Sequence, residues 1–222
     1  MVDSRPHVDT SVTSGLAHEQ PPGASSEFEV FIPDAYAGDR PTAIVLLLHP
    51  SGGNGATMAS DFASDANTNG VILVAPSSQS YTWDRMVSGD YGPDVEEIDG
   101  ALAWAFEHLN VDRAHVAIAG FSDGATYSVL LGLKNGDLFT HVMAFAECAR
   151  IPDDLVGNPL IFIGHGTDDH VLPIADCSRE LVPDLRERGY TVDYLEYPTP
   201  DADGHYVPED ISLQAFAWFT SH

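Results

Sequence analysis

The fold is decided by residues 115–124, which read HVAIAGFSDG. The apolar run at 115–119 predicts a buried strand, and residues 125–133 suit a helix. Between them, Gly120-Phe121-Ser122-Asp123-Gly124 is a G-x-S-x-G pattern, which forms a sharp turn holding its serine in a strained conformation. A side chain at either glycine would collide with the neighbouring strand or helix. The pattern therefore predicts a nucleophilic serine at the carboxyl end of a sheet. A glycine-bracketed helix start is the alternative, since such a pentapeptide arises by chance in about one chain in fifteen of this size.

The length and composition fit one globular domain. The chain has 222 residues, of which 44% are hydrophobic, enough for a substantial core. We expect residues 1–26 to form a polar arm that can hold one edge strand, and residues 27–222 to form the catalytic domain. No apolar run is long enough to span a bilayer, and the first residues lack a basic-then-apolar signal pattern. The sequence thus predicts a cytoplasmic protein.

The charge balance is strongly acidic. There are 34 acidic and 9 basic residues, giving a net charge of −25, and Lys134 is the only lysine. Nucleic acids and anionic membrane surfaces are disfavoured as partners because no basic face can neutralise phosphates. The composition favours a protein adapted to high salt, with an ordinary acidic mesophilic protein as the alternative.

Apolar runs and helix-compatible segments alternate along the chain. This order predicts a single-domain α/β fold with a mostly parallel, doubly wound sheet flanked by helices. Only residues 147–159 separate two of the strands, which is too short for a cap domain, so we expect an open site. The expected strands are 28–32, 43–48, 71–74, 115–119, 141–146, 160–164 and 191–197, and the expected helices are 56–66, 94–109, 125–133, 174–188 and 208–220.

Three residue types needed for nucleophilic catalysis follow predicted strands. Ser122, an aspartate at 168 or 169, and His205 occur in that order along the chain. A serine hydroxyl attacks an ester only when a base such as His205 accepts its proton, and an aspartate orients the imidazole. The glycine-rich loop at 49–55 also follows a strand and predicts one side of an oxyanion hole.

Other side chains near these loops are candidates for contact with substrate. The loop at 75–93 is long and aromatic, so Trp83 and Met86 are expected to form a substrate wall, together with Phe121 and Tyr206. The alternative for Trp83 is that it fills the core.

The remaining histidines and the two cysteines are expected to be structural. His49 and His165 are expected to brace loops beside the site. No set of residues has the spacing of a metal site, so we expect neither a metal nor a cofactor. Cys148 and Cys177 each follow a strand and can lie close together, but a cytoplasmic location favours free thiols over a disulfide.

From about residue 28 to residue 219 the chain resembles the compact, lidless serine esterases of the alpha/beta-hydrolase superfamily, of the phospholipase/carboxylesterase type. The resemblance rests on GFSDGA at 120–125, HGTDDHVLP at 165–173 and GHYVP at 204–208. It implies that the triad acid is Asp169. The amides of Ser51 and Asp123 are the expected oxyanion donors. The family usually has glycine where Pro50 stands, and proline has no N–H to donate.

The resemblance implies hydrolysis of small, uncharged carboxylic esters through an acyl-enzyme, by a monomer or homodimer. An acyl-thioesterase or a lysophospholipase is the alternative, although the acidic surface disfavours phosphate-bearing substrates. A peptidase and an inactive ligand-binding module on the same fold are weaker alternatives, since the triad residues are all present and no extra domain is visible.

Overall fold

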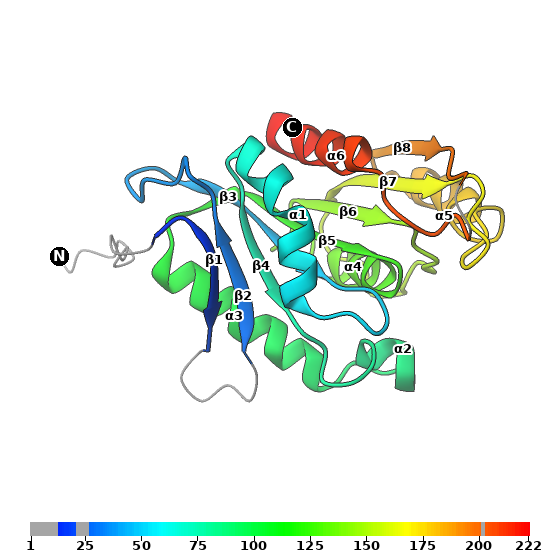
Figure 1. Ribbon diagram of the computed structural model, residues 1–222. Helices are drawn as coiled ribbons and strands as arrows, with labels where there is room; N and C mark the ends of the chain where they lie inside the picture. The colour runs from blue at the N-terminus through cyan, green and yellow to red at the C-terminus, as the bar shows by residue number, and fades with distance from the viewer. Residues whose placement is uncertain (1–12, 21–26, 201–202) are drawn as a thin grey trace.

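The computed structural model describes residues 13–20, 27–200 and 203–222, and within them one mixed sheet forms the centre of the molecule (Figure 1). Its eight strands lie in the order β1-β2-β4-β3-β5-β6-β7-β8. The first two pairings are antiparallel, and every pairing from β4 to β8 is parallel. The strands are β1 (Gly15–Glu19), β2 (Phe28–Ile32), β3 (Thr42–Leu48), β4 (Ile72–Pro76), β5 (Val111–Phe121), β6 (His141–Phe145), β7 (Leu160–Gly166) and β8 (Val192–Tyr197).

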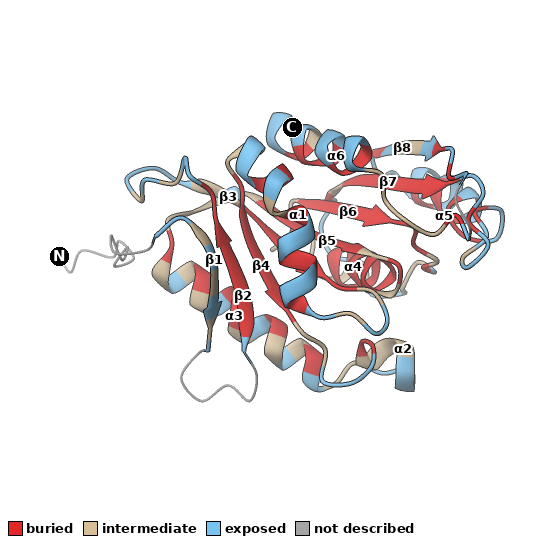
Figure 2. Cartoon of the chain, in the orientation of Figure 1, coloured by how far each residue is buried: buried red, intermediate tan, exposed pale blue. Residues whose placement is uncertain are grey.

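Helices cover both faces of this sheet. Alternate residues of a buried strand point to opposite faces, so a continuous apolar run supplies two cores at once. In β3, Ile44, Leu46 and Leu48 belong to one core, and Val45 and Leu47 to the other. The first core is closed by α3 (Pro93–His108), α4 (Asp123–Lys134) and α5 (Ser178–Glu187), and the second by α1 (Gly55–Asn69) and α6 (Glu209–Ser221). The central strands are accordingly buried along most of their length (Figure 2).

The predicted fold class is confirmed. The sheet is mostly parallel, and residues 146–159, between β6 and β7, contain no helix that could form a cap. The edge strand expected in the first 26 residues is β1, which pairs antiparallel with β2. The rest of that predicted arm, residues 1–12 and 21–26, lies outside the described residues, and its boundary at residue 26 stays a prediction. In the described part of the chain, no helix is long and apolar enough to cross a membrane.

Two helices differ from the prediction. A short helix, α2 (Asp84–Ser88), lies inside the stretch expected to be a loop. Its first residue is fixed by tertiary contacts, because the Asp84 amide donates to Asp94 Oδ2 at 2.6 Å and the Gly92 amide donates to Asp84 Oδ2 at 2.6 Å. The other difference is α5, which begins at Ser178 rather than near residue 174.

Candidate active site

Ser122 occupies the sharp turn between β5 and α4. Its backbone has φ 57° and ψ −121°, a conformation that costs a non-glycine residue of order 1–3 kcal/mol. A Cβ added at Gly120 would lie 2.4 Å from the carbonyl carbon of Gly124, and one at Gly124 would lie 2.2 Å from the carbonyl oxygen of Leu48. The Ser122 amide donates to the carbonyl oxygen of Phe145 at 3.0 Å, which ties the turn to β6. The predicted strained turn, with no room at either glycine, is confirmed.

A hydrogen-bonded line connects Ser122, His205 and Asp169. His205 Nε2 lies 2.8 Å from Ser122 Oγ, and His205 Nδ1 lies 2.7 Å from Asp169 Oδ2. A carboxylate only accepts, so Nδ1 carries the hydrogen and Nε2 is free to accept from the serine hydroxyl. Asp169 is buried, and its Oδ1 accepts from the amides of Val171 at 2.9 Å and Leu172 at 2.8 Å. The arrangement can activate Ser122 as a nucleophile.

Asp168 lies next to this line without joining it. Its side chain is exposed and accepts from the hydroxyl of Thr167 at 2.9 Å. Its carbonyl oxygen would lie 2.0 Å from a Cβ at Gly204, so the two loops touch at their backbones. Gly204 has φ 69°, and this left-handed glycine places His205 opposite Asp169.

The loop after β3 is braced by His49. This ring is buried, its Nδ1 donates to the carbonyl oxygen of Pro50 at 2.8 Å, and its Nε2 accepts from the amide of Ser78 at 2.9 Å. Burial lowers the pKa of His49, which keeps the ring neutral and able to accept. Ser51 follows β3, and Asp123 follows the neighbouring β5. The carboxylate of Asp123 accepts from the hydroxyl of Thr82 at 2.8 Å.

No family model matches the chain. Among curated proteins, feruloyl esterase C of Emericella nidulans is 29% identical over 156 residues, which are 67% of this chain and 56% of that protein. The chain therefore spans about half the length of the curated relatives it matches. Among solved structures, esterase PE8 has a TM-score of 0.71 at 19% identity and covers 94% of this chain and 99% of that one. A phospholipase/carboxylesterase from Dyadobacter fermentans has a TM-score of 0.63 at 18% identity, covering 87% of this chain and 96% of that one.

The chain has the alpha/beta-hydrolase fold. This likeness confirms the expected resemblance to esterases at the level of fold. In this fold the carboxyl ends of the parallel strands meet at one edge, where β5 supplies Ser122, β7 leads to Asp169 and β8 leads to His205.

Trp83 does not contact the space next to Ser122, so its assignment as a substrate-wall residue is wrong. The side chain is fully buried, its ring lies 4.7 Å from that of His49, and it stacks on Tyr127 at 5.5 Å. Its Nε1 donates to the carbonyl oxygen of His49 at 2.9 Å. Trp83 therefore fills the core beneath the loop after β3, as the alternative interpretation had it. Met86 packs against the same core and does not line the hollow beside the site.

Phe121 and Tyr206 do line that hollow. Its volume is about 460 Å³, and the Phe121 ring lies 4.8 Å from the ring of His205. Residues of α1 and α6 also line the hollow, and they could not be predicted from the sequence because neither helix carries a motif. The further lining residues include the apolar Met58, Phe62 and Val207 and the acidic Asp61, Asp65 and Glu209.

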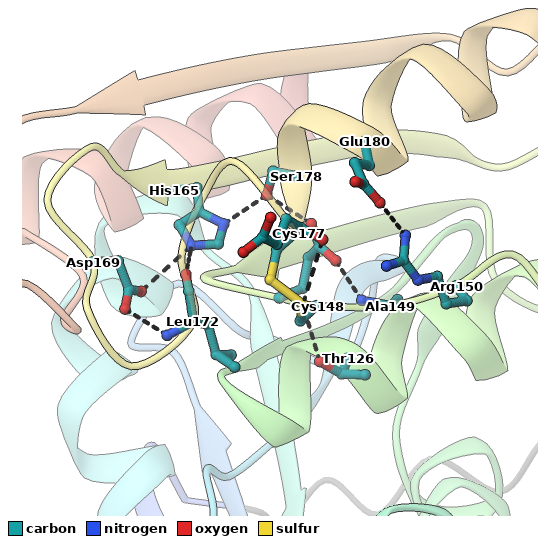
Figure 3. The surroundings of a disulfide bond; sticks show 12 residues. Thr126, Cys148, Ala149, Arg150, His165, Asp169, Leu172, Cys177, Ser178 and Glu180 are labelled. Atoms are coloured by element: carbon teal, nitrogen blue, oxygen red, sulfur yellow. Dashed lines mark hydrogen bonds and ion pairs between the residues drawn. A yellow bond between two sulfur atoms is a disulfide. The ribbon is translucent and has the colours of Figure 1, made fainter.

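Cys148 and Cys177 form a disulfide, contrary to the expectation of free thiols (Figure 3). Cys148 follows β6 and Cys177 precedes α5, so the bond ties the segment after β6 to the helix that follows β7. The two strands are neighbours in the sheet, which brings the cysteines together despite a sequence separation of 29. The sequence indicates that the two cysteines can lie close together, but it does not show that they are bonded.

Proposed function

We propose that the chain is a serine carboxylesterase with Ser122 as nucleophile, His205 as general base and Asp169 as the acid that orients it. This proposal rests on the two hydrogen bonds of the His205 ring, between Nε2 and Ser122 at 2.8 Å and between Nδ1 and Asp169 at 2.7 Å. In this mechanism His205 takes the hydroxyl proton as Ser122 attacks the ester carbonyl, and then gives it to the leaving alcohol. Water next attacks the acyl-enzyme with His205 again as base, which releases the acid and restores Ser122.

The amides of Ser51 and Asp123 are proposed to stabilise the tetrahedral oxyanion. Both follow adjacent parallel strands at the edge that carries Ser122. An amide placed this way is worth about 3–4 kcal/mol in the transition state. Asp123 begins α4, whose amino terminus adds a favourable dipole for the developing negative charge.

The substrates are proposed to be small, uncharged esters whose acyl group enters the hollow between α1 and α6. Aromatic acyl esters fit the rings of Phe62, Phe121 and Tyr206, and the curated relative is named as a feruloyl esterase. The absence of a helix between β6 and β7 leaves little enclosed surface for a long chain, at about 0.8 kcal/mol per buried methylene. The net charge of −25 disfavours thioesters of coenzyme A and lysophospholipids, which carry phosphate.

A fluorophosphonate probe and an ester panel test this function. The probe should label Ser122, and Ser122→Ala should lower kcat by at least about a thousandfold. Ser221→Ala, at the exposed end of α6, serves as the control and should be unaffected. Within the panel we expect higher kcat/KM for short acyl and feruloyl esters than for long-chain esters, thioesters or peptides. Labelling of another serine would refute the assignment, and a preference for long chains would refute the substrate class.

The location and assembly of the protein are also proposals. A cytoplasmic location stays a prediction, and the Cys148–Cys177 disulfide supports an oxidising compartment instead, because most cytosols keep thiols reduced. A monomer or homodimer that acts on a small-molecule ester, without a nucleic-acid or membrane partner, stays the expectation for assembly and partners.

A further inference from the structure

A line of buried polar groups continues from Asp169 into the protein (Figure 3). His165 Nε2 lies 2.9 Å from the carbonyl oxygen of Leu172 and 3.4 Å from Asp169 Oδ2. On the other side of the ring, Nδ1 lies 2.6 Å from Ser178 Oγ, and that oxygen lies 2.6 Å from Glu147 Oε1. Glu147, His165 and Ser178 have 0% exposed surface. The mechanism proposed above uses none of these three side chains.

The hydrogens in this line can be counted. His165 Nε2 must carry one, because the carbonyl oxygen of Leu172 only accepts. The hydroxyl of Ser178 has a single hydrogen, which goes either to Glu147 or to His165 Nδ1. If it goes to an ionised Glu147, a neutral His165 points a lone pair at the lone pairs of Ser178 across 2.6 Å. One additional proton, on either His165 or Glu147, is therefore needed to satisfy the line.

Burial decides where this proton rests. With the proton on His165, the site holds a separated carboxylate and imidazolium, whereas with the proton on Glu147 both groups are neutral. Neutral groups are far less costly to remove from water than charged ones. Burial is the largest cause that raises the pKa of Glu147 and also the largest that lowers the pKa of His165. Both directions favour the neutral pair.

The charged groups around the pair do not reverse this balance. Arg150 favours an ionised Glu147, but its guanidinium is exposed and pairs with Glu180 at 2.5 Å. Tyr194 of β8 interacts with Glu147 only electrostatically, and its raised pKa keeps the phenol neutral. The second oxygen of Glu147 accepts from the amide of Ala149 at 2.7 Å, which a protonated carboxyl still permits.

On the side of His165, Asp169 favours the imidazolium and His205 opposes it. Burial outweighs both, and the pKa of His165 remains lowered.

The disulfide joins the two ends of the buried line. Cys148 directly follows Glu147, and Cys177 directly precedes Ser178. The covalent bond therefore holds together the same two segments that the contact between Glu147 and Ser178 connects. A flexible pair of loops would let water reach these polar groups, and the cross-link opposes that separation.

We propose that Glu147, Ser178 and His165 form a relay that holds one proton in the interior and positions Asp169, the triad acid of the function proposed above. In this relay, which we call the Glu147 relay, the Glu147 hydroxyl donates to Ser178, and Ser178 donates to His165. His165 then donates to the carbonyl oxygen of Leu172, whose amide donates to Asp169 Oδ1. The relay residues do not touch the reacting atoms; they fix the turn that presents Asp169 to the base.

The held proton is tested by the pH dependence of stability of Glu147→Gln. A glutamine amide donates to Ser178 at every pH, whereas wild type loses stability as pH rises from the unfolded-state pKa of Glu147 through its raised folded-state value. The unfolding equilibrium constant of the variant relative to wild type should therefore fall, by up to about tenfold per pH unit, as pH rises above the unfolded-state pKa of Glu147. Glu187→Gln, at an exposed glutamate of α5, is the matched control and should show a constant ratio. A constant ratio for Glu147→Gln would overturn the held proton.

The positioning role is tested by kcat per active serine, with active serines counted by fluorophosphonate titration. Ser178→Ala and Glu147→Leu should lower this kcat about tenfold with KM changed less than twofold, because the acid is misplaced and the substrate hollow is intact. Glu147→Gln should keep kcat within about twofold of wild type, since it preserves the donor. Thr140→Val, which removes a hydroxyl at the amino end of β6, is the control for loss of an internal hydrogen bond.

Each result has one interpretation. Wild-type kcat in Ser178→Ala would overturn the positioning role, and this variant decides the question if Glu147→Leu does not fold. If kcat of Glu147→Gln falls as far as kcat of Ser178→Ala, an ionised carboxylate is required at position 147, and the protonated relay is overturned. If wild type hydrolyses no ester and reacts with no phosphonate, the proposed function and the positioning role both fail, while the stability measurement still decides whether the interior holds the proton.

Discussion

The disulfide between Cys148 and Cys177 should supply a large part of the stability of the fold, and replacing both cysteines by alanine tests this. The bond closes a loop with a sequence separation of 29. In the chain-entropy model, opening a loop of this length stabilises the unfolded chain by about 3.6 kcal/mol at 25 °C. For a chain of this size each kcal/mol corresponds to about 2–4 °C, so Tm should fall by about 7–14 °C.

Urea unfolding of oxidised wild type, reduced wild type and Cys148→Ala/Cys177→Ala measures the effect. Trp83, one of the three tryptophans of the chain, is fully buried and contributes to the fluorescence signal. The reduced protein and the double variant should agree with each other, because both lack the cross-link, and their m-values should exceed that of the oxidised protein as the unfolded chain expands. A loss below about 1 kcal/mol would refute the loop-closure reasoning, as the model requires more for a loop of this length. Two free thiols titrated in the denatured, unreduced wild type would refute the bond itself.

Three further predictions concern the site and the surface. Asp169→Asn should lower kcat by at least about a thousandfold and the exposed Asp168→Asn by less than threefold, and the opposite order would move the triad acid to Asp168. Trp83→Phe should lower the free energy of unfolding by about 1–3 kcal/mol, because it leaves the buried carbonyl oxygen of His49 without its donor, and should lower kcat by disturbing the loop after β3. Urea unfolding and initial rates measure the two effects, and an unchanged kcat would show that Trp83 does not hold that loop in its active conformation. Raising KCl from 0.1 to 1 M shortens the screening length from about 10 to about 3 Å, which weakens the repulsion among the acidic side chains that give the net charge of −25. Tm should therefore rise more than in a charge-balanced hydrolase, and a flat Tm would refute adaptation to high salt.

Much of the fold and the Ser122 turn could be predicted from the sequence, because the forces behind them are local. The apolar runs of the central strands have the length and composition of strands buried on both faces, so their order along the chain indicated a parallel sheet. The turn at Ser122 needs glycine at 120 and 124 for steric reasons, and that requirement is visible as a pattern of five residues. The order of Ser122, an aspartate at 168 or 169, and His205 could also be read directly, since each follows a strand, whereas the choice of Asp169 rested on the family resemblance.

The tertiary structure alone decided the features that depend on segments far apart in sequence. Trp83 was an equal candidate for the core and the substrate wall until the sheet placed His49 and Tyr127 against it. The helix α2 forms where Asp84 and Asp94 exchange contacts, which no local propensity encodes.

The same holds for the disulfide and the Glu147 relay. Glu147 and Ser178 are 31 positions apart, and neither belongs to a recognisable motif. They meet because β6 and β7 are adjacent and parallel, so the segments that leave their carboxyl ends share one buried space. Side-chain periodicity shows that a strand is buried, but it does not show which strand lies next to it. The neighbouring strand determines whether a buried carboxyl contacts a hydroxyl and a histidine or has no hydrogen-bond partner.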